Sequence, residues 1–77
     1  MDSQEKKYFN MFKEEILKYE VLDSQTADIL LNRYISHLTK RRFFNESFKR
    51  KYYSFWFKIL VGSGYLIPKG MGYQVRK

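Results

Sequence analysis

The sequence predicts a mainly helical α+β domain in which three helices are followed by a C-terminal β-hairpin. Apolar residues recur at helical spacings of three and four in three separate segments of the chain. After the third segment, two short β-prone stretches flank a turn that contains two glycines. The 77 residues contain no internal repeat, low-complexity segment or linker. We therefore expect a single domain that spans residues 1–77.

The first helix is expected from about Gln4 to Tyr19. Its apolar positions recur at spacings of three and four and are Phe9, Phe12, Ile16 and Tyr19. The opposite face is charged, and Glu14 and Lys18 form a favourable pair four residues apart. This pattern predicts an amphipathic helix.

The second helix is expected to begin at Asp23 or Ser24, since the preceding residues from Val21 break the first pattern and either side chain is a good N-cap. Its apolar line consists of Ala27, Leu31, Tyr34, Ile35 and Leu38. We place a turn or short loop from about Thr39 to Phe44, where basic residues end the amphipathic pattern.

The third helix is expected to follow Asn45, which can cap its N-terminus, with Glu46 suited to the positive end of the helix dipole. One predicted face is apolar and comprises Phe48, Tyr52, Phe55, Trp56 and Ile59. The other is basic and polar and comprises Ser47, Arg50, Lys51, Ser54 and Lys58. Gly62 and Gly64 are expected to end the helix.

The rest of the chain predicts a hairpin. Tyr65–Pro68 and Tyr73–Arg76 are β-prone, and the Lys69–Gly72 segment between them permits a tight or bulged turn. Pro68 cannot donate a ladder hydrogen bond, so we expect it at a strand end or on an edge.

Charge is divided unevenly along the chain, whose formal net charge is +7. Residues 1–38 hold five basic and seven acidic side chains, which gives a net charge of −2. Residues 39–77 hold ten basic side chains against Glu46 alone, which gives +9. The C-terminal half is therefore expected to face an anionic partner.

Several functions are disfavoured by composition. The chain has no Cys and a single His, His37, so it offers no disulfide framework, thiolate zinc site or Cys nucleophile. No group of residues supports catalysis, and we expect no enzyme activity, cofactor, metal or small-molecule substrate. The longest apolar runs are too short to span a membrane, and the N-terminus is unlike a signal peptide. We expect a cytoplasmic protein.

The order of elements resembles the winged helix-turn-helix family of DNA-binding domains. The resemblance is carried by the apolar line of the second helix, the basic helix from Asn45 to Val61, and the Gly- and Tyr-containing ending from Gly62 to Val75. The segment from Thr39 to Phe44 is longer than the turn of a tight helix-turn-helix. The resemblance implies that the third helix enters the major groove and that the hairpin is a wing. If the chain forms a homodimer, we expect the first helix to supply the contact.

Candidate nucleic-acid-binding residues follow from the resemblance and the charge. In the loop they are Lys40, Arg41 and Arg42, which we expect to bind phosphates. On the third helix they are Ser47, Arg50, Lys51, Ser54 and Lys58. Arg50 is the first candidate for a base contact, since Arg suits a bidentate contact with guanine. In the hairpin, Lys69 and Arg76 would reach the DNA backbone or minor groove.

Duplex DNA is the favoured ligand, and we expect a role in transcription regulation, replication or recombination of a virus, plasmid or other mobile element. Two alternatives stay open. The aromatics Phe43, Phe44, Tyr53 and Phe57 do not all fit the apolar faces, and on a helical wheel Phe57 falls near Arg50 and Tyr53 at the boundary of the apolar side. Such rings either pack against the first helix or the hairpin or stack on single-stranded DNA or RNA bases, for which Tyr53 and Phe57 are the candidates. The basic half would also suit an acidic protein partner or an anionic membrane surface.

Overall fold

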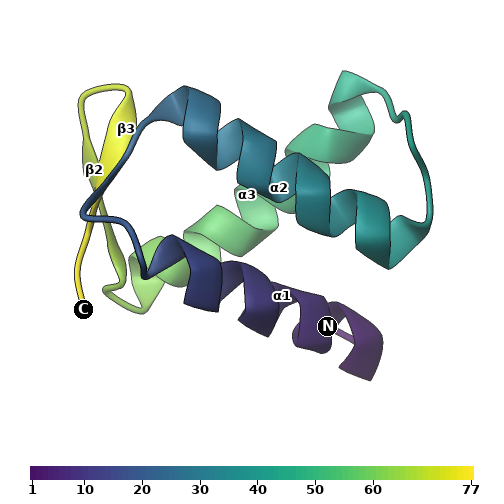
Figure 1. Cartoon of the computed structure of the whole chain (residues 1–77), viewed down its shortest axis with the longest axis horizontal. Helices are drawn as coiled ribbons and strands as arrows, with labels where there is room; N and C mark the ends of the chain where they lie inside the picture. The colour runs from purple at the N-terminus through teal and green to yellow at the C-terminus, as the bar shows by residue number, and fades with distance from the viewer.

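Three helices and a small antiparallel sheet make up the fold, which is given by a computed structural model describing all residues from Met1 to Lys77. The elements are α1 (Ser3–Ile16), β1 (Val21–Leu22), α2 (Ser24–Thr39), α3 (Glu46–Gly62), β2 (Leu66–Lys69) and β3 (Gly72–Val75). The hairpin of β2 and β3 lies at one end of the helices, and the loop between α2 and α3 lies at the other (Figure 1). The predicted α+β class, with three helices and a C-terminal hairpin, is confirmed.

Each helix begins at a side chain that caps it. Asp2, Asp23 and Asn45 each accept a hydrogen bond from the backbone N–H three residues later, at 2.7, 2.7 and 2.8 Å. These bonds satisfy N–H groups that have no partner within the helix. The sequence predicted the caps of α2 and α3 but placed the start of α1 later.

α1 ends three residues before the predicted Tyr19. The backbone N–H groups of Lys18 and Tyr19 donate to carbonyls three residues back, at 3.1 and 3.0 Å, which tightens the chain into a turn. The turn leads into β1, and it leaves Tyr19 exposed rather than on the buried face of a helix.

The sheet has the strand order β1-β3-β2, with both pairs antiparallel. Val21 pairs with Gln74 and Leu22 with Tyr73, so the segment expected only to break the helical pattern adds a third strand. Pro68 lies on β2, an edge strand, as its missing N–H requires. This sheet joins the hairpin to the start of α2.

Gly72 is the closest approach in the sheet. A Cβ at this position would overlap the carbonyl oxygen of Leu22 and lie 3.0 Å from the Cα of Asp23. Since both neighbours are backbone atoms at the cap of α2, Gly72→Ala is expected to lower the free energy of unfolding by about 1–3 kcal/mol. Urea unfolding followed by Trp56 fluorescence measures this loss.

Gly62 provides the matched control. A Cβ there meets nothing within 4 Å, and its backbone φ is not positive. Gly62→Ala is therefore expected to leave stability unchanged or to raise it by up to about 1 kcal/mol. Equal losses from the two substitutions would contradict the close contact between β3 and the start of α2.

The core contains 13 buried side chains, all apolar. They come from every helix and strand and are Phe9, Phe12, Ile16, Leu22, Ala27, Leu30, Leu31, Ile35, Trp56, Phe57, Leu60, Leu66 and Val75. Trp56 lies in an aromatic cluster, with its ring centroid 5.1 Å from that of Phe12 and 5.6 Å from that of Phe9. Burial of such large rings gives a short chain a substantial core.

Two carboxylates fix α1 against the other helices. Glu5 accepts a hydrogen bond from the indole N–H of Trp56 at 3.0 Å, which joins α1 to α3. Glu15 pairs with Arg33 at 2.7 Å and accepts a hydrogen bond from the hydroxyl of Tyr34, which joins α1 to α2. This bond to a carboxylate raises the pKa of the Tyr34 phenol.

Candidate nucleic-acid interface

The outward face of α3 carries the five polar residues predicted from the sequence. Ser47, Lys51, Ser54 and Lys58 follow one another at spacings of four, three and four, so they form one line along the helix. Arg50 lies beside this line. All five side chains are exposed, and none of them takes part in an ion pair. We call these five residues the basic face of α3.

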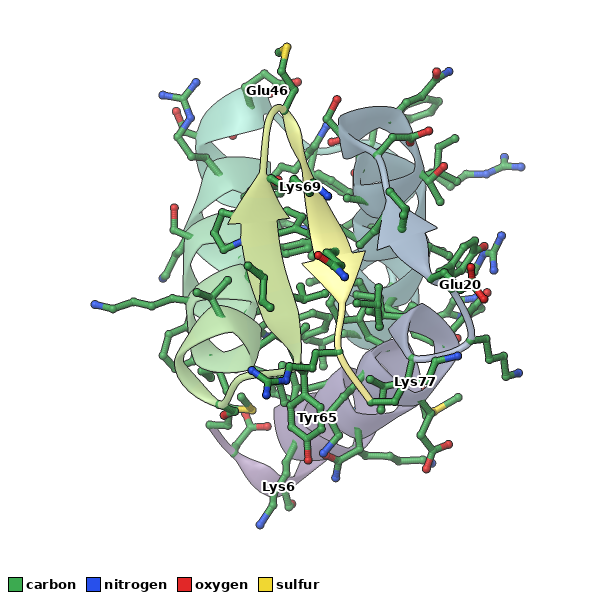
Figure 2. The ribbon with its side chains drawn as sticks, turned by 90° about the vertical axis from the view of Figure 1, so that its left-hand side faces the viewer. Lys6, Glu20, Glu46, Tyr65, Lys69 and Lys77 are labelled. Carbon is green, nitrogen blue, oxygen red and sulfur yellow. The ribbon has the colours of Figure 1, made fainter.

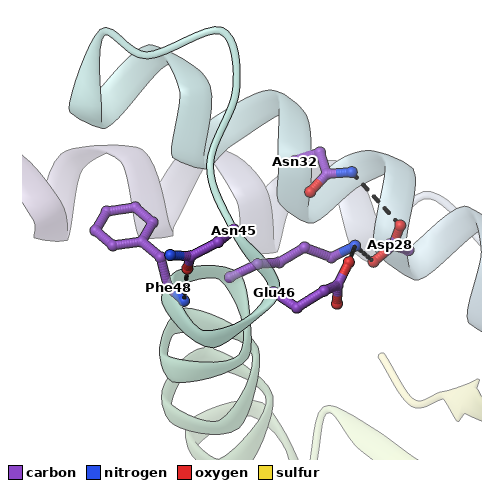
Figure 3. A network of polar contacts seen from close by, with 6 residues as sticks. Asp28, Asn32, Asn45, Glu46 and Phe48 are labelled. Atoms are coloured by element: carbon purple, nitrogen blue, oxygen red, sulfur yellow. Dashed lines mark hydrogen bonds and ion pairs between the residues drawn. The ribbon is translucent and has the colours of Figure 1, made fainter.

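Lys49 differs from the other basic residues of α3. Its ammonium lies 2.5 Å from a carboxylate oxygen of Asp28 and 3.9 Å from one of Glu46, and its side chain is only 17% exposed. Asp28 also accepts a 3.4 Å hydrogen bond from the side-chain amide of Asn32 (Figure 3). Lys49 therefore joins α3 to α2 and is not available to an external anion.

The loop between α2 and α3 presents the three basic residues that were predicted there. Lys40 ends α2 with a left-handed backbone (φ 58°) and is the one non-Gly residue with a positive φ. The guanidinium of Arg41 lies over the ring of Phe48, 5.1 Å from its centroid. Arg42 is exposed, and no carboxylate pairs with any of the three. The loop is thus an uncompensated positive segment next to the N-terminus of α3.

The two predicted hairpin residues lie far from each other. Lys69 is next to the turn at Gly70, at the tip, whereas Arg76 follows β3 at the base of the hairpin, where its backbone N–H donates to Tyr65 at 2.8 Å. Figure 2 shows this separation, with Lys69 toward the tip and Tyr65 and Lys77 at the base. Met71 at the tip is 89% exposed and was not among the predicted residues.

The helical wheel is wrong in placing Phe57 on the outward side of α3, and the alternative that this ring packs against the first helix or the hairpin is confirmed. Its side chain is only 3% exposed, whereas Phe55, assigned to the apolar face, is 46% exposed. The hairpin packs on the side of α3 that carries Phe57, so the buried face of the helix is rotated toward the hairpin. The ring of Phe57 stacks on those of Tyr53 and Tyr73, with centroids at 4.4 and 5.2 Å.

A groove of about 470 Å³ runs between α3 and the hairpin above these rings. Tyr53 and Tyr73 line it, together with Lys58 and Met71. The two phenol oxygens are 3.4 Å apart. Burial and this contact raise the pKa of Tyr53 well above the usual value of a phenol. Tyr53 is half-buried, so it belongs to the packing between α3 and the hairpin.

The raised pKa of Tyr53 predicts a loss of stability in alkali. Above about pH 10 the phenol ionises in the unfolded chain but stays protonated in the folded one, so the free energy of unfolding falls as pH rises. Tyr53→Phe is expected to make this fall smaller. Tyr34 and Tyr52 also have raised pKa values, through hydrogen bonding and burial respectively. Part of the fall in the free energy of unfolding therefore remains in the Tyr53→Phe variant. Urea unfolding between pH 8 and about pH 11 tests this, and identical pH profiles would contradict it.

Most of the positive charge of the C-terminal half is uncompensated. Of its ten basic residues, only Lys49 is within ion-pair distance of a carboxylate. The eight predicted site residues that are basic have no carboxylate partner, and all ten predicted nucleic-acid-binding residues, with Ser47 and Ser54 included, are exposed.

Comparisons with family models, curated proteins and solved structures found no match for this chain. None of its helices is long and apolar enough to cross a membrane.

Proposed function

We propose that this protein is a winged helix-turn-helix domain that binds duplex DNA through the basic face of α3. The observation that carries the proposal is the line of Ser47, Lys51, Ser54 and Lys58 with Arg50 beside it, all exposed and without a carboxylate partner. Such a face is unfavourable without a ligand because its charges repel one another. An α-helix fits the major groove, where phosphates flank the base edges.

The side chains of the basic face suit different parts of the duplex. The guanidinium of Arg50 can donate two parallel hydrogen bonds to guanine, while the ammonium groups of Lys51 and Lys58 suit phosphates. Ser47 and Ser54 are short donors that allow the helix backbone to approach the DNA. Arg50 lies near Asp28 and Glu46 in a shallow hollow, which places it at the edge of the face toward α2.

The loop and the hairpin tip extend this contact beyond the ends of α3. Lys40, Arg41 and Arg42 lie on the N-terminal side of the helix, where we propose that they hold phosphates. Lys69 at the hairpin tip holds the backbone or enters the minor groove. Arg76 lies at the base of the hairpin, at the opposite end from Lys69, and we propose that it contacts a separate stretch of the DNA backbone. We further propose that this DNA binding serves transcription regulation, replication or recombination of a virus, plasmid or other mobile element.

Fluorescence anisotropy with labelled random duplex and single-stranded oligonucleotides, at several salt concentrations, tests the proposal. If four to six phosphates are neutralised, log K for duplex falls with log salt with a slope of about −3.6 to −5.4, at roughly −0.9 per phosphate. Preference for duplex with such a slope supports the proposal. Absence of binding at low salt overturns it and directs attention to an acidic protein or membrane partner.

A further inference from the structure

Phe43 is the most exposed of the 15 aromatic residues, at 89%, and the other exposed rings reach only 46% and 36%. It lies in the loop between α2 and α3 and packs against no other ring. A large apolar ring held in water gains nothing for the fold. The residues around Phe43 therefore indicate which ligand its ring can contact.

The surroundings of Phe43 are a hollow of about 560 Å³ between the end of α2 and the loop. Its lining consists of Ser36, His37, Arg41, Arg42 and Phe43, so four of the five side chains can donate hydrogen bonds and none is a carboxylate. Neither Arg has an acidic partner. A hollow with this lining suits a phosphate group.

Two of these side chains are held in position. The guanidinium of Arg41 rests on the ring of Phe48, 5.1 Å from its centroid. The imidazole of His37 stacks on Tyr8 of α1, with the planes within 13° and the centroids 6.5 Å apart. A donor that is already oriented loses less conformational entropy when an anion binds.

Side chains that can donate hydrogen bonds to a phosphate, next to an exposed aromatic ring, match the chemistry of one nucleotide. Inside a duplex the faces of each base are covered by the neighbouring bases, so away from the end of a duplex Phe43 can stack only on an unpaired base. The loop immediately precedes α3, and the hairpin lies at the other end of that helix (Figure 1). An unpaired nucleotide in this hollow would thus extend from one end of the duplex bound by α3.

We propose that the hollow beneath the α2–α3 loop binds an unpaired nucleotide of a single-stranded extension, with its phosphate on Arg41 and Arg42 and its base on Phe43. The proposal rests on the proposed duplex binding by α3 and specifies the DNA further, as a duplex with a single-stranded overhang. It also assigns base stacking to Phe43, which is exposed, instead of Phe57, which is buried.

The test compares one duplex sequence with a blunt end, with a 5′ overhang and with a 3′ overhang, and the two overhang duplexes carry 2-aminopurine as the first unpaired base. Anisotropy is expected to show binding to one overhang that is about fivefold or more tighter than to the blunt duplex, with a change in 2-aminopurine fluorescence from stacking. Phe43→Ala is expected to remove this advantage while keeping affinity for the blunt duplex. Phe43→Trp is expected to restore it.

Tyr19→Ala is the matched control, because Tyr19 is another exposed aromatic and belongs to the segment between α1 and β1. That segment lies at the hairpin end of the fold, opposite the α2–α3 loop (Figure 1). It should keep the preference for the overhang. Equal affinity for blunt and overhang duplexes, or an equal loss for both in Phe43→Ala, overturns the inference. Affinity for the blunt duplex separately reports on the basic face of α3, so failure of the two proposals is distinguishable.

Discussion

Replacing Arg50, Lys51 and Lys58 together with Gln is expected to weaken duplex binding by on the order of 100-fold or more at about 0.1 M salt. Each phosphate neutralised by Lys51 or Lys58 contributes roughly 0.9 log units of affinity between 1 M and 0.1 M salt, and the base contact of Arg50 contributes about 1–3 kcal/mol, so the three losses together remove more than two log units. The same variant should reduce the magnitude of the salt slope by about 1.8 and lower the discrimination between sequences. If Arg50 contacts a phosphate instead, the slope falls by about 2.7.

The matched control replaces Lys6, Lys7 and Lys18 of the α1 region with Gln. These lysines are also exposed and have no ion-pair partner. Each triple variant removes three positive charges, so the two variants carry the same net charge. Because all six side chains are exposed, both variants are expected to fold, which far-UV circular dichroism checks. If binding depends on the basic face, only the first variant loses affinity. Equal losses would mean that the affinity for duplex DNA depends only on the net charge of the protein.

Features encoded within a few neighbouring residues were predictable from the sequence. The cap of α2 was predicted at Asp23 or Ser24 and that of α3 at Asn45, because a cap needs only a short polar side chain before an apolar pattern. Asp23 and Asn45 form the expected bonds. The outward positions of Lys51, Ser54 and Lys58 follow from helical spacing in the same way. These are local properties of one helix.

Features that depend on a distant segment were not predictable. β1 has only two residues, too few to show alternation, and it forms because β3 offers a partner. Lys49 is identical in type to Lys51, and only the approach of Asp28 on α2 separates a neutralised lysine from a free one. In each case the missing information is the position of another element.

The aromatic residues of α3 combine both situations. A helical wheel gives the angles between Phe55, Trp56 and Phe57, but it does not say on which side of the helix the neighbouring elements lie. Trp56 is buried as predicted, because it faces α1. Phe57 is buried because the hairpin covers its side, and Phe55 is left half-exposed. The aromatic ring most accessible to a base, Phe43 at 89% exposed, therefore lies outside α3.

Phe57→Ala is expected to lower the free energy of unfolding by about 3–5 kcal/mol, since the side chain is 3% exposed and packs against Phe12, Tyr53 and Tyr73. A small domain has about 5–15 kcal/mol in total, so this change removes a large part of its stability. Urea unfolding followed by Trp56 fluorescence measures it. The loss would show that the ring serves the packing between α3 and the hairpin.

Phe57→Leu separates packing from nucleic-acid binding, because Leu fills most of the same space but has no ring to stack on a base. The variant is expected to be less destabilised than Phe57→Ala and to stay folded at about 10 °C, well below the usual thermal midpoint of such domains. Under those conditions it should bind duplex and single-stranded oligonucleotides as the unchanged chain does. A folded Phe57→Leu variant that loses only single-strand binding would return base stacking to α3, because the ring would then contact a base despite its burial. If the variant binds each ligand with the same affinity as the unchanged chain, Phe43 remains the aromatic ring that an unpaired base can reach.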